Sequence, residues 1–246
     1  MKLLSHIGRF TLLMLITFKR PESWKSFRKR IVTEMNDLGL DSLPIIAVIS
    51  VFMGAVVTIQ TSTNIDSGFI PLYTVGFAAR QSVILEFSPT IIALILVGKV
   101  GSSISSEIGT MRVTEQIDAL EIMGINSANF LIFPKIIAAV LINPFLITLS
   151  MAIGIAGGYA VAVGTGLIGA SDYEYGIQLD FKMYDYYYAM IKTVVFAFVL
   201  TSIPAYFGYY TSGGSVEVGK SSTTAVVVSS IVILILNYLL TQLLLI

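Results

Sequence analysis

The sequence predicts an all-α integral membrane protein, with an N-terminal interfacial helix followed by five transmembrane helices. Hydrophobic residues make up 55% of the 246 residues and charged residues only 12%, against about 25% charge in ordinary soluble domains. Five apolar runs are long enough to cross a bilayer, which takes about 20 helical residues. A polar stretch at residues 98–124, between the second and third runs, has the pattern of a cytoplasmic amphipathic helix.

Composition excludes several classes of function. The formal net charge is zero, so the chain as a whole gives no electrostatic case for binding nucleic acid. It has no cysteine, which rules out disulfides and thiol catalysis, and its single histidine is His6. A histidine cluster within one chain is therefore impossible. We expect neither a metal site nor enzymatic activity in this chain.

The N-terminal segment, residues 1–42, is predicted to be cytoplasmic and helical. Its apolar stretch Phe10–Phe18 is too short to span a bilayer and has cationic flanks, which favours a helix lying in the membrane interface. A soluble flap and a cleaved signal peptide are the alternatives. The following Lys19-Arg20-Pro21-Glu22 does not resemble a small-residue cleavage site.

The remaining residues, 43–246, are predicted to form one five-span domain. The first span follows Asp41-Ser42 and has Pro44 in its first turn, a favourable position for proline. The third is long for one span and too short for two with a turn, so we expect it to tilt or project beyond the bilayer. The predicted spans are residues 43–65, 82–106, 134–164, 187–209 and 223–245.

The distribution of basic residues predicts the orientation. Segment 1–43 contains eight, whereas the connections after the first and third spans contain only Arg80 and Lys182. Since lysine and arginine accumulate on the cytoplasmic side, the N-terminus is predicted inside. Five spans then place residues 107–133 and 210–222 inside and the C-terminus outside. The eight basic residues are Lys2, Arg9, Lys19, Arg20, Lys25, Arg28, Lys29 and Arg30.

Two residue patterns concern how the spans meet lipid and one another. Gly154 and Gly158 have the spacing that allows close helix approach in lipid. A tyrosine cluster precedes and enters the fourth span, and we interpret it as an aromatic belt at the outer interface, with a ligand role as the alternative. Its members are Tyr184, Tyr186, Tyr187 and Tyr188.

Residues 112–124 are predicted to form a short coupling helix. Val113, Ile117 and Leu120 recur at a spacing of four and three, which places them on one stripe of a helix. Gly124 is a plausible C-terminal stop. Such a helix at a cytoplasmic turn can fit a groove in a soluble partner, and the alternative is a solvated helix without a partner. The candidate contact residues are Arg112, Val113, Glu115, Gln116, Ile117, Asp118, Leu120 and Glu121.

Residues 98–124, and above all Glu107–Leu120, closely resemble the signature of the MlaE/YrbE family, permease subunits of ABC transporters that work with MCE-domain proteins. The resemblance covers roughly residues 40–245. It extends to four further segments: 52–60, Glu86-Phe-Ser-Pro89, Phe133-Pro134-Lys135 and 213–228.

This resemblance implies a homodimeric permease in a bacterial inner membrane, with a coupling helix that docks a separate ATPase. It implies that phospholipid or a related lipid moves between that membrane and a periplasmic MCE-domain carrier. A small ATPase-associated cytoplasmic subunit is a further implied partner. ATP and magnesium would be bound by the ATPase, so we expect no cofactor in this chain.

The residues give weaker support to two other classes of function. A secondary transporter or channel without an ATPase would need intramembrane charges for ion coupling, and we find mainly Glu86. A membrane enzyme is disfavoured by the single histidine, the lack of cysteine and the absence of an acid cluster within a span.

Glu86 lies about one turn inside the second predicted span, where an ionisable residue is costly and usually faces a cavity or a partner. We hypothesise that it lines an outward-open lipid cavity at the dimer axis, and the alternative is a structural bond to a neighbouring helix. Where the family often has arginine before this glutamate, the chain has Leu85, which leaves Arg80 as a substitute charge. The lipid-pocket candidates are Glu86, Gln60, Pro89 and Arg80.

Lys99 and Glu107 are candidate gate or structural residues. They are eight residues apart, about 12 Å along a helix, which is too far for a direct pair. We expect each to bond elsewhere near the cytoplasmic gate, in a structural role rather than to substrate. The family usually has arginine at the position of Lys99, and lysine keeps the charge but loses the planar fork.

Residues 214–221, Gly-Ser-Val-Glu-Val-Gly-Lys-Ser, match the phosphate-loop pattern G-x-x-x-x-G-K-S. That chemistry requires a strand before the loop and a soluble helix after it. Predicted membrane helices flank the segment instead. We therefore expect a cytoplasmic loop and a capped helix start rather than a nucleotide site.

Overall fold

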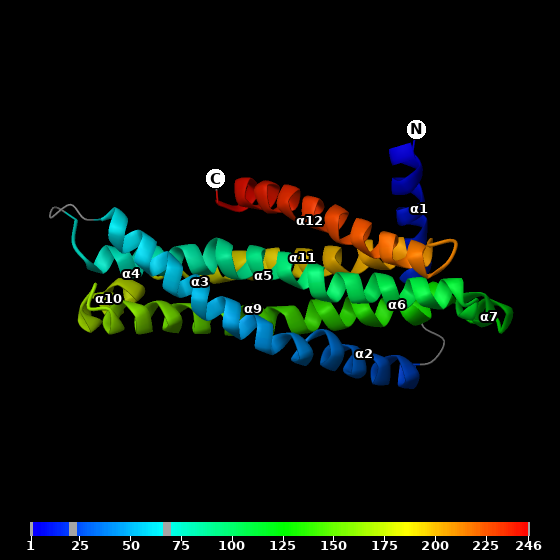
Figure 1. The fold of residues 1–246 in the computed structure, drawn as a ribbon, viewed down its shortest axis with the longest axis horizontal. Helices are drawn as coiled ribbons and strands as arrows, with labels where there is room; N and C mark the ends of the chain where they lie inside the picture. The colour runs from blue at the N-terminus through cyan, green and yellow to red at the C-terminus, as the bar shows by residue number, and fades with distance from the viewer. Residues whose placement is uncertain (1, 20–23, 66–69, 246) are drawn as a thin grey trace. The chain divides into compact units, whose positions relative to one another are not determined.

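The computed structural model of the chain describes residues 2–19, 24–65 and 70–245, and within these ranges it contains helices and no strand. Five helical stretches are long and apolar enough to cross a membrane. This confirms the predicted all-α membrane fold with a short apolar helix before the spans (Figure 1). The stretches are Trp24–Asn64, Tyr73–Val113, Ser127–Gly164, Met183–Tyr209 and Ser215–Leu245.

By internal contacts the chain divides into two compact units, each assembled from several separate segments. Unit 1 comprises residues 1–41, 93–143 and 194–246, and unit 2 comprises residues 42–92 and 144–193. The boundaries fall within helices: α9 (Phe133–Gly164) passes from unit 1 to unit 2 at Asn143–Pro144, and α11 (Met183–Tyr209) passes back at Thr193–Val194.

Unit 1 holds most of the N-terminal and polar segments. Its α12 packs along α6, because Ser222 Oγ donates to the Ser102 carbonyl at 3.0 Å and Val218 lies against Gly109. Its α1 contacts α11, where His6 Nδ1 lies 2.8 Å from the Tyr206 hydroxyl. Besides its parts of α9 and α11, this unit contains α1 (Lys2–Thr17), α2 (Trp24–Leu38), η3 (Val97–Gly101), α6 (Ser102–Val113), α7 (Gln116–Ile122), α8 (Ser127–Leu131) and α12 (Ser215–Leu245).

Unit 2 depends on glycines that let helix backbones meet. A Cβ at Gly54 of α3 would overlap the Gly154 carbonyl oxygen of α9, and one at Gly157 would lie 2.5 Å from the Val51 carbonyl oxygen. The close approach predicted around Gly154 and Gly158 is therefore present, with α3 as the neighbouring helix. Besides its parts of α9 and α11, unit 2 contains α3 (Leu43–Asn64), α4 (Tyr73–Ser82), η2 (Val83–Ile91) and α10 (Ala170–Gln178).

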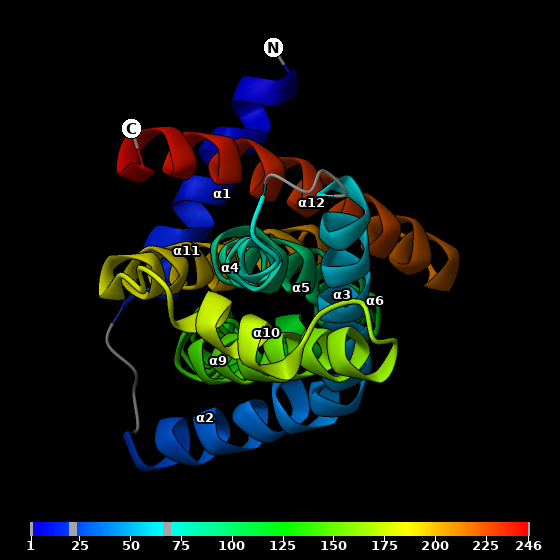
Figure 2. The ribbon, with the colours of Figure 1, turned by 90° about the vertical axis from the view of Figure 1, so that its left-hand side faces the viewer.

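A short helix that the sequence did not lead us to expect, α10, packs against α4 (Figures 1 and 2). The backbones meet because a Cβ at Gly76 or Gly176 would run into the facing carbonyls of Tyr173 and Tyr73. Tyr173 is buried, and burial raises the pKa of its hydroxyl, which remains a donor to the Ile155 carbonyl at 3.3 Å.

The second span differs from the prediction in length and in form. It runs as one helical stretch over Tyr73–Val113, against the predicted 82–106, and passes through α4, η2, α5 (Ile92–Leu96), η3 and α6. Two of these segments, η2 and η3, are π-helices. Pro89 lies in η2, and widening of a helix near proline relieves the clash of its ring with the preceding turn.

The structure adds detail to two segments outside the predicted spans. The N-terminal segment forms two helices, α1 from Lys2 and α2 from Trp24, while Arg20 to Ser23 lie outside the described residues. The phosphate-loop pattern falls mostly inside α12, because this helix begins at Ser215, and Glu217 accepts from the Gly214 amide at 3.2 Å. No strand precedes that pattern in the described part of the chain.

Candidate functional site

An ion pair between two helices is the most distinctive polar feature of unit 2. Lys192 of α11 donates to Glu86 Oε1 in η2 at 2.7 Å, and the lysine side chain is fully buried. Its ammonium also lies 4.5 Å from the centre of the Tyr188 ring. Glu86 accepts from Thr90 at 3.2 Å and from the Tyr188 hydroxyl at 3.5 Å. Because burying an unpaired charge is costly, this pair fixes the two helices together.

Lys192 also has a backbone acceptor in η2. Its Nζ donates to the Leu85 carbonyl at 3.2 Å, so one ammonium bonds the Glu86 side chain and the backbone of the residue before it. The two acceptors together offset the cost of burying this charge.

Sequence reasoning missed Lys192, although the signal was present. It is the one basic residue within the predicted fourth span, 187–209, and an ionisable residue at membrane depth is itself a hint of function. The statement that the spans offer mainly Glu86 as an intramembrane charge is therefore wrong. For Glu86 we had considered a lipid cavity and, as the alternative, a structural bond to a neighbouring helix; the structure contains that bond. The Glu86 side chain is nevertheless 40% exposed.

The other three lipid-pocket candidates occupy different environments. Gln60 is exposed on α3, and Pro89 is buried in η2. Arg80 is buried and donates to the carbonyls of Ile177 and Leu179, both at 2.9 Å. Arg80 thereby fixes the end of α10 in place.

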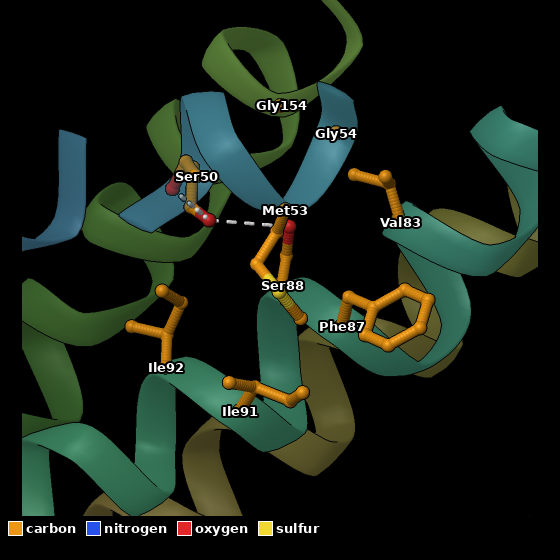
Figure 3. Close-up of a pocket in the computed structure, with 10 residues that line it drawn as sticks. Ser50, Met53, Gly54, Val83, Phe87, Ser88, Ile91, Ile92 and Gly154 are labelled. Carbon is orange, nitrogen blue, oxygen red and sulfur yellow. Dashed lines mark hydrogen bonds between the residues drawn. The ribbon is translucent and has the colours of Figure 1, made fainter. Parts of the chain in front are cut away.

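A small pocket in unit 2 lies where α3, η2 and α9 meet (Figure 3). Ser50 Oγ donates to Ser150 Oγ at 2.8 Å, and Ser150 Oγ donates to Ser88 Oγ at 3.2 Å. The cavity of about 10 Å³ has room for roughly one water molecule and none for an acyl chain. None of the four lipid-pocket candidates is among its ten lining residues: Ser50, Met53, Gly54, Val83, Phe87, Ser88, Ile91, Ile92, Ser150 and Gly154.

The predicted coupling helix is divided in the structure. Helix α6 continues the second span to Val113, and α7 begins only at Gln116. Between them Glu115 has φ +61°, the left-handed region that residues with a side chain rarely adopt. The prediction of one helix over 112–124 is therefore wrong at its start, because a sharp turn at Glu115 ends the span and redirects the chain into α7.

The C-terminal stop of α7 agrees with the prediction. Gly124 has φ +79°, its amide donates to the Glu121 carbonyl at 2.9 Å, and the Ile125 amide donates to the Leu120 carbonyl at 3.0 Å. These two bonds form a Schellman motif, which closes a helix at a left-handed glycine. The last two residues before this glycine, Ile122 and Met123, are 87% and 64% exposed.

The inner side of α7 is held within unit 1. Ile117, from the predicted apolar stripe, is fully buried, whereas Val113 and Leu120 are half-buried. Arg112 pairs with Asp118 at 2.7 Å across the turn, which ties the end of α6 to α7. Glu121 accepts from Ser127 at 2.8 Å and from Tyr209 at 3.0 Å. Gln116 and Glu115 are exposed.

The two gate candidates, Lys99 and Glu107, have separate partners. Lys99 Nζ donates to the Asp41 carbonyl, and Glu107 accepts from Lys135 at 2.8 Å. Both line a cleft of about 330 Å³ in unit 1, which Glu34 and Lys135 also border.

The tyrosine cluster does not behave as one belt. Tyr184 and Tyr187 are exposed, as a belt requires, but Tyr188 is fully buried beside Lys192 and Glu86. Tyr186 lies 3.0 Å from the Thr148 hydroxyl. The prediction is wrong for Tyr188, because successive residues of a helix point in different directions and the inward one meets the ion pair.

Comparison with known proteins gives consistent similarities. A family model described as Permease MlaE matches residues 31–243. A probable ABC transporter permease protein of Rickettsia bellii is 37% identical over 245 residues, covering 98% of this chain and 93% of that protein. One of Synechocystis is 34% identical, covering 88% and 82%. The intermembrane phospholipid transport system permease protein MlaE of Haemophilus influenzae is 32% identical, covering 90% and 85%.

Proposed function

Because the chain belongs to the MlaE family of ABC transporter permeases, we propose that it is the membrane subunit of a transporter that moves phospholipid or a related lipid. In this proposal two copies form the permease in a bacterial inner membrane. A separate cytoplasmic ATPase binds ATP and magnesium, aided by a small associated subunit. The lipid passes between the membrane and a periplasmic MCE-domain carrier.

The observation that carries the proposal is the exposed apolar end of α7. Ile122 and Met123 face outward from a short helix whose opposite side is anchored by the buried Ile117. An exposed apolar pair on a rigidly held helix is suited to a groove in a partner protein. We assign that groove to the ATPase, whose closure on ATP would push α7 and, through α6, the second span.

The distribution of basic residues supports the orientation that this assignment requires. With the N-terminal segment cytoplasmic, α7 lies on the ATPase side and the C-terminus is periplasmic. Residues 165–182, including α10, then face the compartment of the carrier. Glycosylation or protease mapping of tagged termini tests this orientation, and a cytoplasmic C-terminus would contradict it.

Glu86 remains our candidate for contact with the lipid. Its side chain is 40% exposed, whereas Lys192 is buried, so the carboxylate is the member of the pair that can face a headgroup. We expect Glu86→Ala to reduce lipid transport without loss of the dimer. Equal transport at equal expression would contradict the role.

Copurification from a mild detergent is the direct test of the proposed assembly. The tagged chain should retain an ATPase in stoichiometric amount, an MCE-domain protein and phospholipid, each identified by mass spectrometry. Ile122→Asp should release the ATPase while leaving the permease dimer intact. Val216→Asp, which changes an exposed apolar residue of α12, is the matched control.

A lone oligomer without an ATPase would overturn the proposal. The Glu86–Lys192 pair would then become a candidate ion-coupling site in a secondary transporter or channel.

A further inference from the structure

A set of contacts around α8 joins the N-terminal helix α1 to the polar segments of unit 1. Asn129 Nδ2 donates to the carbonyls of Thr17 and Lys19, both at 2.7 Å, at the end of α1. Asn126 Nδ2 donates to the Ile16 carbonyl at 3.2 Å, and its side-chain oxygen caps α8 by accepting from the Asn129 amide. Two amide side chains thus satisfy the carbonyls that α1 leaves open at its end.

The second N-terminal helix, α2, is tied to the same region at two points one helical turn apart. Arg30 donates to the Phe130 carbonyl at 2.5 Å, and its guanidinium lies 3.5 Å from the centre of the Phe130 ring. Glu34 accepts from Lys135 with both carboxylate oxygens, at 2.8 and 2.9 Å. Because residues i and i+4 share one helix face, a single face of α2 carries both contacts.

The third acceptor of Lys135 comes from the helix that leads to the coupling segment. Glu107 of α6 accepts from the same ammonium group at 2.8 Å. The lysine side chain is only 5% exposed, and its three donors meet two oxygens of Glu34 and one of Glu107. A buried ammonium with two carboxylates is held firmly, because separating either partner leaves a desolvated charge.

We propose that Lys135 is a positioning residue that makes α2 move with α6 and α7 during the transport cycle. The proposal rests on the proposed function, since it needs an ATPase that displaces α7. A push on α7 reaches α6 through the short turn at Glu115, and the shared ammonium passes it to α2. Helix α2 continues through η1 (Leu40–Ser42) into the first span, so that span receives the displacement as well.

The test uses the assembled transporter, with its ATPase and carrier, in proteoliposomes. We expect Lys135→Met to keep wild-type ATPase stoichiometry while lipid transferred per ATP hydrolysed falls about tenfold, a usual size for coupling between sites. Lys135→Arg, which keeps the charge, should restore most of this ratio. Lys182→Met is the matched control, because Lys182 forms an exposed pair with Asp180 at 3.3 Å.

A cross-link between α2 and α6 then distinguishes a positioning role of Lys135 from a role in stability alone. The chain has no cysteine, so Glu34→Cys combined with Glu107→Cys provides the only reactive pair within it. The uncross-linked double variant should transport as poorly as Lys135→Met. A short thiol cross-linker that joins α2 to α6 should raise the transport ratio again, and each single cysteine variant treated alike should show no recovery.

Several outcomes would overturn the inference. Wild-type transport per ATP in Lys135→Met is one, and cross-linking that abolishes the remaining transport is another, since α2 and α6 would then have to separate. If Lys135→Met fails to assemble, Glu107→Gln decides the question, because it keeps the pair with Glu34 and should still lower the ratio. A wild-type chain that binds no ATPase refutes the proposed function instead, which is a different result.

Discussion

Replacing Glu86 by glutamine should destabilise the protein more than replacing Lys192 by methionine, although both changes remove the same ion pair. The asymmetry follows from burial: the lysine side chain is 0% exposed and the glutamate side chain 40% exposed. Glu86→Gln removes the negative charge and leaves the buried ammonium with neutral acceptors: the new amide oxygen, the Leu85 carbonyl at 3.2 Å and the Tyr188 ring at 4.5 Å. Lys192→Met leaves a half-exposed carboxylate that keeps Thr90 as a donor.

The expected magnitudes differ by about a factor of three. Breaking a buried ion pair costs about 3–5 kcal/mol, and the remaining carbonyl puts Glu86→Gln near the lower limit. Lys192→Met loses one charge-assisted hydrogen bond from an accessible group, about 1 kcal/mol. The double variant, which leaves no buried charge, should also lose only about 1 kcal/mol, so the two changes are strongly non-additive.

Thermal unfolding of the purified chain in detergent measures this difference. For a chain of this length about 1 kcal/mol corresponds to roughly 2–4 °C, so Glu86→Gln should lower the midpoint by about 6–12 °C. Equal shifts for the two single variants, or a double variant that equals their sum, would refute the reasoning. Such a result would mean that Lys192 does not depend on Glu86 for its charge.

Three further predictions concern packing and backbone. Gly54→Ala should force α3 away from the Gly154 carbonyl and lower the free energy of unfolding by about 1–3 kcal/mol. Gly8→Ala, which has open space around it, is the control and should cause no such loss. Equal thermal midpoints for the two variants would contradict the close packing. Glu115→Gly should stabilise the left-handed turn by about 1 kcal/mol, and an unchanged midpoint would argue against this turn. Arg80→Met should raise hydrogen exchange in α10 by at least about tenfold, since each of its two charged hydrogen bonds is worth about 1.5–3 kcal/mol. Unchanged exchange there would contradict its anchoring role.

The sequence was sufficient for features that depend on local periodicity and on composition. Apolar runs of spanning length predicted the five long helices, and Gly124 predicted the end of α7, because a helix that closes in the left-handed region favours glycine. The motif at residues 98–124 led to the family that the comparisons show. Each of these signals lies within a short stretch of chain, so no knowledge of distant contacts was needed.

Contacts between residues that lie far apart along the chain could not be predicted from the sequence. Lys192 meets Glu86 across 106 residues, and Lys135 meets Glu34 across 101. Periodicity identifies the side of a helix that is apolar, but it does not say which neighbouring helix supplies a counter-charge. This explains why the pairing of Glu86 with Lys192 was not predicted and why Tyr188 was assigned to the lipid interface.

By itself the amino-acid sequence determined that this protein is a helical membrane protein with a polar segment between its second and third spans, because hydrophobic length and local turn chemistry impose that much on any chain with this pattern. That it is a permease came from the resemblance of residues 98–124 to a known family. Only the tertiary structure decided that Glu115 breaks the coupling segment, that Lys192 meets Glu86 and the Leu85 carbonyl, and that one buried lysine joins α2 to α6. These features arise where helices pack, because a buried charge is stable only beside the partners that folding brings to it.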